Sequence, residues 1–195
     1  MTTVLQSPPA AKLLTYEAYM AEEENNRRYD IIDGERIYMA GATDDHQDYE
    51  GNIFVVFREF GRSTGAGKAR MAPRDILIRR SPLRTRQPDV YFISAERIAL
   101  NPASNDPAPL TAAPELVVEI ISDSETKKRF GGKIADYCAV GVEECWKVWQ
   151  DTRTVEVLRL SASGYETVRV YGAGEVVESF VFPGLSVAVD AIFAE

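Results

Sequence analysis

The stretch PELVVEIISDSETKKRFGGKIADY, residues 114–137, places a carboxylate inside a run of branched apolar residues. We expect a strand over 115–121, in which Glu119 shares one face with Val117 and Ile121, because side chains alternate between the two faces. Burial disfavours the charged form of a carboxyl group and raises its pKa. Glu119 therefore needs a nearby cation, either a metal ion or a lysine, if it is to stay ionised.

A second carboxylate has the right position for the same site. Asp89 opens the apolar stretch DVYFIS, and Pro88 before it is typical of a strand end. If the two strands are neighbours, the carboxylates of Asp89 and Glu119 can bind one divalent cation. We expect Mg²⁺, with Mn²⁺ as a substitute, because Mg²⁺ binds one or two carboxylates together with water and phosphate.

Lys133 lies on the helix expected after the Glu119 strand, beside the apolar side chains of Ile134, Tyr137 and Cys138. A lysine at the edge of such a face can extend along the sheet and bring its ammonium group to the carboxylates. Two carboxylates, a hard cation and a lysine suit the hydrolysis of a phosphodiester. The metal would polarise the phosphate and lower the pKa of a bound water, and the lysine would stabilise the hydroxide or the phosphoryl oxygens.

Each of these three residues also has a purely structural interpretation. Asp89 could be a turn residue after a proline, Glu119 could pair with a buried basic side chain, and Lys133 could extend from a surface helix into water. Their order along the chain, on a strand, a strand and a helix, favours a shared site.

The elements expected before Asp89 are two helices, a hairpin and one or two strands. TYEAYMAEEENNRR has helical spacing, with Thr15 as its N-cap. Asp33-Gly34 separates two short β-type runs and predicts a hairpin turn. DDHQDYEGNIFVVFREFGR predicts an amphipathic helix that ends at Gly61. A strand or a pair of strands is expected around Pro73.

After Asp89 the sequence predicts a strand, a loop over residues 100–114, the strand over 115–121, and a helix to about Val140 closed by Gly141. EECWKVWQ and TVEVLRL are expected to pair, and strand-like patterns continue to the C-terminus. This order predicts an α/β or α+β domain built on a central mixed sheet. Residues 1–12 are expected to be a flexible arm and residues 13–195 a single domain.

The composition narrows the class of protein. Of the 195 residues 45% are hydrophobic, which is enough for one domain, and no apolar run approaches the ~20 residues of a membrane-spanning helix. The N-terminus lacks a signal-peptide pattern, so we expect a cytoplasmic protein with reduced thiols at Cys138 and Cys145. One histidine and two cysteines cannot build a His/Cys zinc site, so a metal would have oxygen ligands.

The formal net charge of -8 weighs against a protein that coats nucleic acid through bulk charge, although it allows a local basic groove. Two segments concentrate positive charge and are candidates for contact with phosphates: Arg79, Arg80, Arg84 and Arg86 in the first, and Lys127, Lys128 and Arg129 in the second. The alternative is that both segments are solvated surface.

Several motifs together resemble the Uma-type family of restriction endonucleases, a branch of the PD-(D/E)XK nuclease superfamily. The motifs are PDV, VVEIIS, the helical lysine followed by a tyrosine, and GVEECWKV, with LTYEAYM, RYDIIDGERIYMAG and DDHQD upstream and FPGLSVAVDAIF downstream. The resemblance covers nearly the whole chain. It implies a restriction-endonuclease-like fold, in which helices flank a central mixed sheet, with an N-terminal hairpin and a β-rich C-terminus.

The resemblance also implies roles for individual residues. Asp89 matches the aspartate of the PD motif, and Glu119 matches the second acidic residue. The lysine of the superfamily usually lies two positions after that acid, where this chain has Ile121. Lys133 matches the helical lysine that takes its place in Uma-type proteins.

Four further positions are accessory candidates or departures from the family pattern. His46 matches a histidine common in the family, and its alternative is a surface residue near a helix end. Glu35 could add a carboxylate, although an exposed strand residue is the more common outcome. Tyr137 could orient Lys133 or only pack. Asp30 stands where the family tends to have glutamate, which puts any role of that position in question.

These observations predict a Mg²⁺-dependent endonuclease that hydrolyses phosphodiester bonds in DNA. The alternative is a catalytically inactive nuclease-like fold that acts as a binding or assembly module. Action on RNA or on single strands is left open by the sequence. A homodimer is compatible with the long β-rich C-terminus.

Overall fold

A computed structural model describes residues 13–22, 27–103, 106–121 and 127–194, with the side chains of the last range described from residue 130 onward. The flexible arm expected over residues 1–12 lies outside the described residues. So do the side chains of Lys127, Lys128 and Arg129, for which phosphate contact was predicted.

The centre of the fold is a sheet of six strands. β7 and β8 are parallel and the other neighbouring pairs are antiparallel, so the sheet is mixed, as predicted. The strands lie in the order β10 (Gly164–Tyr171), β9 (Thr154–Ser161), β8 (Glu144–Trp149), β7 (Leu116–Ile121), β6 (Val90–Ser94) and β3 (Gly67–Met71).

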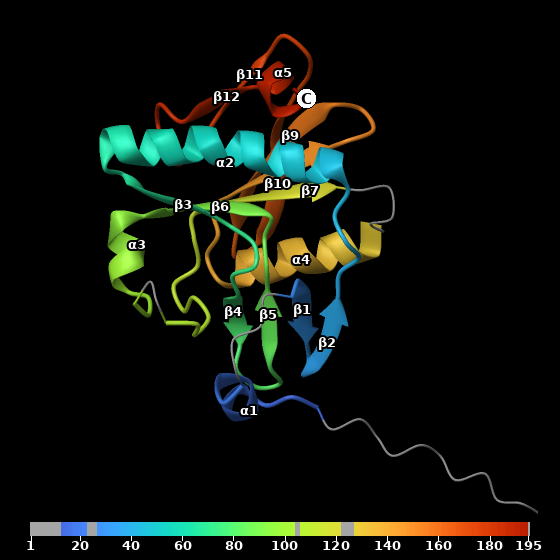
Figure 1. Ribbon diagram of the computed structural model, residues 1–195, viewed down its shortest axis with the longest axis vertical. Coiled ribbons are helices and arrows are strands. Elements are labelled where there is room, and N and C mark those ends of the chain that lie inside the picture. Colours follow the sequence, from blue (N-terminus) through green and yellow to red (C-terminus); the bar gives the residue numbers. More distant parts are fainter. Residues whose placement is uncertain (1–12, 23–26, 104–105, 122–126, 195) are drawn as a thin grey trace, which may run out of the picture.

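Two helices cover the opposite faces of this sheet, α2 (Asp44–Thr64) on one and α4 (Lys127–Ala139) on the other (Figure 1). The apolar residues of α2 recur every four positions and pack with the sheet in one core cluster, to which Ile53 and Phe57 belong. Ile134 and Tyr137 of α4 belong to the cluster on the other face. This layering follows from the apolar stripe of each helix.

β7 is buried along its whole length, because both faces of this central strand are covered by a helix. Its alternate residues divide between the two cores as the strand period requires. Leu116, Val118 and Ile120 belong to the α2 side, and Val117 belongs to the α4 side. Glu119 therefore points toward α4.

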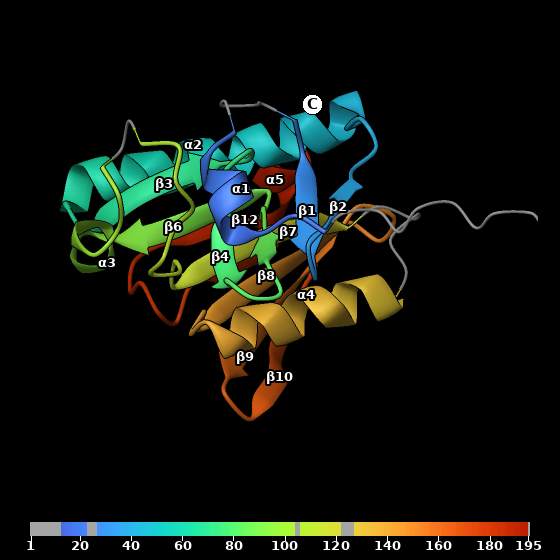
Figure 2. The ribbon, with the colours of Figure 1, turned by 90° about the horizontal axis from the view of Figure 1, so that it is seen from below.

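A smaller sheet lies beside α4, on the same side of the central sheet (Figure 2). Its four strands lie in the order β2 (Glu35–Tyr38), β1 (Tyr29–Ile32), β5 (Arg84–Arg86) and β4 (Ile76–Arg79). The predicted hairpin joins β1 to β2. Asp33 and Gly34 in its turn have φ of 53° and 85°, a backbone conformation that Asn, Asp and Gly adopt most readily.

The remaining elements are short. They are α1 (Tyr16–Met20), α3 (Ala95–Ala99), a hairpin of β11 (Val176–Glu178) and β12 (Ser186–Ala188), and α5 (Val189–Ile192). None of the described helices combines the length and the apolar character needed to cross a membrane.

Three predictions about elements need correction. α2 runs past Gly61 and ends at Gly65, which has a left-handed φ of 71°. Gly61 is instead a close-packing position, since a Cβ there would lie 2.7 Å from the carbonyl oxygen of Gly67. α1 is much shorter than its helical pattern. The C-terminus is not entirely β, because Val189–Ile192 forms a helical turn that packs into the α2-side core.

Candidate active site

Asp89 and Glu119 come together because their strands are neighbours. β6 and β7 are antiparallel with Val90 opposite Val118, and one further step in this register sets Asp89 beside Glu119. Asp89 Oδ2 accepts the backbone N–H of Ile120 at 2.6 Å. The two residues are only 3% and 1% exposed, so this pair of carboxylates is buried, as expected for a site rather than a surface.

Glu119 is held by two side chains of α4. The ammonium group of Lys133 lies 2.7 Å from Glu119 Oε2, and the Tyr137 hydroxyl donates to Oε1. Lys133 and Tyr137 are four residues apart, so they project from the same face of the helix. The predicted helical lysine therefore reaches the second carboxylate, and Tyr137 contacts the same carboxylate. The cation that the buried Glu119 requires is Lys133.

Asp89 is held by two groups that come from elsewhere in the chain. Arg28 Nη2 donates to Asp89 Oδ1 at 2.6 Å. His46, in the first turn of α2, has its Nε2 atom 3.5 Å from the same oxygen. This nitrogen is buried, and no group in the described part of the chain forms a well-aligned hydrogen bond with it.

Glu50 is a carboxylate of this site that the sequence reasoning missed. It follows His46 by one turn of α2 and is 7% exposed. Burial raises the pKa of Glu50 to about 7, and the negative charge of Asp89 adds to this increase. The spacing of four between His46 and Glu50 on one helix face was the available signal. Arg28 was also missed, and no local pattern marks it.

The environments of the two central carboxylates drive their pKa values apart. Burial alone would raise the pKa of Asp89, but the imidazole of His46 and the positive charge of Arg28 hold it below the ordinary range. Burial raises the pKa of Glu119 to about 7 against the opposing effect of Lys133, and the charge of Asp89 raises it further. Such divergence between neighbouring acids is typical of catalytic sites.

A buried ion-pair network positions the segment that leads to Asp89. Arg86 in β5 donates to Asp30 Oδ2 and to Asp136 Oδ2, each at 2.7 Å. The backbone N–H of Gln87 donates to Asp30 Oδ1 at 3.3 Å. Asp30, which replaces the glutamate of the family pattern, therefore ties β1 to the chain just before Pro88 and Asp89.

The other predicted site residues lie outside this cluster. Glu35 is exposed on β2. Arg79 and Arg84 pair with Asp33, and Arg84 also pairs with Asp136 of α4. Arg80 lies over the ring of Tyr16, 4.8 Å from its centroid. Arg84 and Arg86 therefore have carboxylate partners within the protein, and the phosphate contact predicted for the arginines of this segment stays a prediction.

The side chains around Asp89 fit a hard divalent cation in their chemistry. They provide three buried carboxylates, Asp89, Glu119 and Glu50, and the buried Nε2 of His46, which lies 3.5 Å from Asp89 Oδ1. Each carboxylate has about four lone-pair positions, so the bonds to Arg28, Ile120 and Lys133 do not exhaust them. The fit is one of chemistry and not of assembled geometry, because no three acidic, histidine or cysteine side chains in the described ranges are grouped closely enough to hold a metal ion.

Comparison with known protein families and solved structures also indicates a nuclease-like protein. A family model named Uma2, described as "Putative restriction endonuclease", matches residues 13–190. A crystal structure of a "putative nuclease belonging to DUF820" from Anabaena variabilis ATCC 29413 is similar, with a TM-score of 0.74 at 17% identity. The match covers 92% of this chain and 97% of that chain, and at this identity it shows a shared fold. No curated protein matches the chain.

Proposed function

The chain belongs to the Uma2 family of restriction-endonuclease-like proteins, and from this premise we propose that it is a nuclease that hydrolyses phosphodiester bonds of DNA with a divalent cation, Mg²⁺ or Mn²⁺. The observation that carries the proposal is the convergence of Asp89, Glu119 and Lys133 in one buried cluster. Two acids and a lysine from three separate elements would be costly to bury together without a function.

Asp89 and Glu119 would hold the cation, with Glu50 and His46 beside them. Mg²⁺ commonly binds through one or two carboxylates and completes its shell with water and substrate phosphate. When bound, the cation would lower the pKa of a water molecule and polarise the phosphate. Lys133, held by Glu119, would place a positive charge next to the phosphoryl oxygens.

Arg28 is the counter-ion of Asp89 while no cation is bound. Its guanidinium neutralises Asp89, and its side chain is 24% exposed, compared with 5% for Asp89. A partly exposed arginine on a buried carboxylate is a counter-ion that can move aside toward water. It therefore stabilises the metal-free chain and competes with a cation for the same oxygen.

The test is cleavage of plasmid, linear duplex and single-stranded DNA, and of RNA, with Mg²⁺ or Mn²⁺. We expect Asp89→Ala to lose cleavage and Glu35→Gln, which removes an exposed carboxylate outside the cluster, to keep it. Cleavage retained in a purified, folded Asp89→Ala variant would contradict the proposal. Cleavage of RNA but not DNA would replace the substrate and keep the reaction class.

The homodimer expected from the sequence stays a prediction. β10 is an edge strand of the central sheet, and Tyr165, Val168 and Val170 on it are exposed. An exposed edge with apolar side chains is a common place for strand pairing between subunits. Analytical ultracentrifugation of the wild type and of Val168→Lys tests it.

A further inference from the structure

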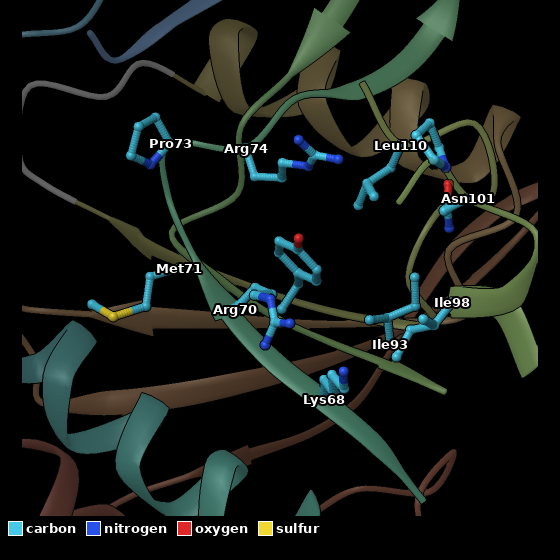
Figure 3. A pocket seen from close by; sticks show the side chains of 11 residues that line it. Lys68, Arg70, Met71, Pro73, Arg74, Ile93, Ile98, Asn101 and Leu110 are labelled. Carbon is cyan, nitrogen blue, oxygen red and sulfur yellow. The ribbon is translucent and has the colours of Figure 1, made fainter. Parts of the chain in front are cut away.

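A cavity of about 240 Å³ lies at the edge of the central sheet, outside the cluster around Asp89. It is formed by β3, β6, α3 and the segment after α3. In the view of Figure 3, Lys68, Arg70 and Arg74 lie on one side of it and Ile93, Ile98 and Leu110 on the other.

Among the described residues, no ion pair neutralises the cationic side of the cavity. None of the described residues that line the cavity is acidic. Arg70 donates from Nη1 to the backbone carbonyl of Ala69 at 2.9 Å, and Arg74 donates from Nη1 to that of Asp106 at 2.8 Å. These bonds fix the two guanidinium groups without cancelling their charge, and each group keeps free donors. In a chain of net charge -8, such a set of cations indicates an anionic ligand.

Tyr91 supplies a polar group inside the cavity. It lies on β6, opposite Arg70 in β3, and is 2% exposed. Among the described residues no side chain or backbone group forms a hydrogen bond with its hydroxyl. The ring is buried, but the hydroxyl oxygen itself reaches the open space of the cavity, so it is available to a ligand. With Ile93 and Leu110 beside it, the site offers both an apolar wall and a polar anchor.

The cavity lies close to the candidate active site along β6, although no residue of the cluster around Asp89 lines it. Tyr91 follows Asp89 by two residues, so it lies about 7 Å farther along the strand and on the same face. The backbone N–H of Ala72, which follows β3, donates to the carbonyl oxygen of Asp89 at 3.0 Å. A group bound beside Tyr91 and Arg70 would therefore be a near neighbour of a phosphate at Asp89.

Positive charge also continues beyond the cavity. A second hollow on the α2 side of β3 is lined by Arg58 and Arg62 together with Lys68 and Arg70. β3 is the edge strand, so these side chains lie near the rim of the sheet, where Arg62 is paired with Glu59. Cations that line two neighbouring hollows suit a polyanionic strand better than they suit a single small anion.

We propose that this cavity, which we call the edge pocket, holds one unstacked nucleotide of the nucleic-acid strand that is cut at Asp89 and Glu119. The phosphates of that nucleotide and of its two neighbours contact Lys68, Arg70 and Arg74, the base lies against the apolar wall, and the Tyr91 hydroxyl bonds to the base. The inference rests on the proposed function. It deepens that function by specifying a substrate with an unpaired nucleotide beside the scissile bond, because a base in a duplex is stacked and paired.

The test is binding without hydrolysis. Fluorescence anisotropy in EDTA compares a short labelled single strand with a duplex of the same sequence. We expect the single strand to bind more tightly, and Arg70→Ala to weaken it about tenfold and Tyr91→Phe about threefold, as for the loss of a charged and a neutral hydrogen bond. Arg153→Ala is the matched control, because it removes the same charge from an exposed turn between β8 and β9, away from β3.

The outcomes separate the edge pocket from the nuclease proposal. Equal effects of Arg70→Ala and Arg153→Ala, or tighter binding of the duplex, would overturn the edge pocket even if DNA is cleaved with Mg²⁺. Arg70-dependent binding of a strand that is never cleaved would support the pocket and contradict the nuclease. Deoxyadenosine monophosphate and inorganic phosphate serve as competitors. If the mononucleotide binds with the same dependence on Arg70 but the single strand does not, the strand is the wrong ligand.

Discussion

Four charged side chains at the centre of this molecule form two ion pairs, and the pairs differ in their exposure to water. Lys133 and Glu119 are 6% and 1% exposed, so this pair is closed to water. In the pair of Arg28 and Asp89, the arginine side chain is partly exposed to water. A buried pair costs desolvation of both charges, and removal of one partner leaves the other uncompensated. The second pair can open at lower cost, which makes Asp89 the more accessible carboxylate for a cation.

Replacing Lys133 by alanine tests the closed pair. We expect the cleavage rate to fall by about 10²–10⁴, the range for loss of one positioned catalytic group, while Mn²⁺ still binds because it can supply the missing positive charge. Cleavage assays and calorimetric Mn²⁺ titration measure the two effects. Lys147→Ala is the control, since Lys147 lies 2.6 Å from Glu156 in a pair on the same sheet. Full activity of a folded Lys133→Ala protein would remove Lys133 from the reaction.

Replacing Arg28 by glutamine tests the ion pair between Arg28 and Asp89. Without the competing positive charge, Mn²⁺ should bind Asp89 about tenfold more tightly, which corresponds to about 1.4 kcal/mol. Calorimetric titration of wild type and variant measures the change. Arg36→Gln is a suitable control because Arg36 pairs with Glu22 away from the site. Weaker metal binding in Arg28→Gln would mean that Arg28 supports the cation site instead of competing for it.

Glu50 connects the site to the pH dependence of stability. The pKa of Glu50 is about 7 in the folded chain, above the ordinary value of 4.5, because of burial and the charge of Asp89. The folded protein therefore holds a proton that the unfolded chain has released. The resulting stabilisation is complete below the ordinary pKa and is lost as pH rises through about 7.

Glu50→Gln should remove this dependence, because glutamine stays neutral. In EDTA we expect the variant to be more stable than wild type at about pH 8 by on the order of 1 kcal/mol, a value reduced from ~1.4 kcal/mol per pKa unit for partial hydration. Below about pH 4, where the carboxyl group is protonated in both states, the difference should vanish. Urea denaturation across this range measures it, and a constant difference at every pH would show that titration of Glu50 is not its cause.

At the scale of elements, the small sheet fixes the position of the segment that leads to Asp89. β1 and β5 meet through Asp30 and Arg86, and Asp136 ties the same arginine to α4. The chain passes from β5 through Gln87 and Pro88 directly to Asp89. These contacts explain why a four-stranded sheet that contributes no residue to the proposed active site is part of the fold.

Arg86→Met tests this structural role. Removal of one partner from a buried ionic network costs about 3–5 kcal/mol, and Arg86 is 2% exposed, so we expect a loss of that size in the free energy of unfolding. Arg79→Met removes an exposed pair with Asp33 and should cost less than about 1 kcal/mol. Denaturation of both variants measures the contrast. If Arg86→Met kept its stability but lost nucleic-acid binding, the phosphate contact predicted for Arg86 would be supported instead.

Elements with a strong period were predictable from sequence, and those that depend on distant contacts were not. α2, α4 and the β8–β9 pair were predicted because apolar spacing and turn residues act locally. α5 was missed because Val189 and Ile192 are β-branched, and packing under α2 overrides their strand preference. In the site, the meeting of Asp89 and Glu119 followed from strand pairing. The contact of Arg28 with Asp89 spans 61 residues, and no local pattern predicts such a contact.

At the scale of the whole molecule, charge is distributed unevenly. The net charge of -8 opposes the approach of nucleic acid at long range. Many described arginines are paired with carboxylates, among them Arg84, Arg86 and Arg97. Lys68, Arg70 and Arg74 at the edge pocket form no ion pair within the described ranges. Binding should therefore depend on a few local contacts rather than on the overall field.

The salt dependence of single-strand binding tests this distribution. Each phosphate neutralised on a single strand contributes about -0.7 to the slope of log K against log salt, so the edge pocket with its three cations predicts a slope of about -2. Anisotropy in EDTA at several salt concentrations measures it, and Arg70→Ala should make the slope shallower by slightly less than one unit. A wild-type slope near -6 would require several more cations at the strand. In that case the basic run at the start of α4, with Lys127, Lys128 and Arg129, would be the next segment to vary.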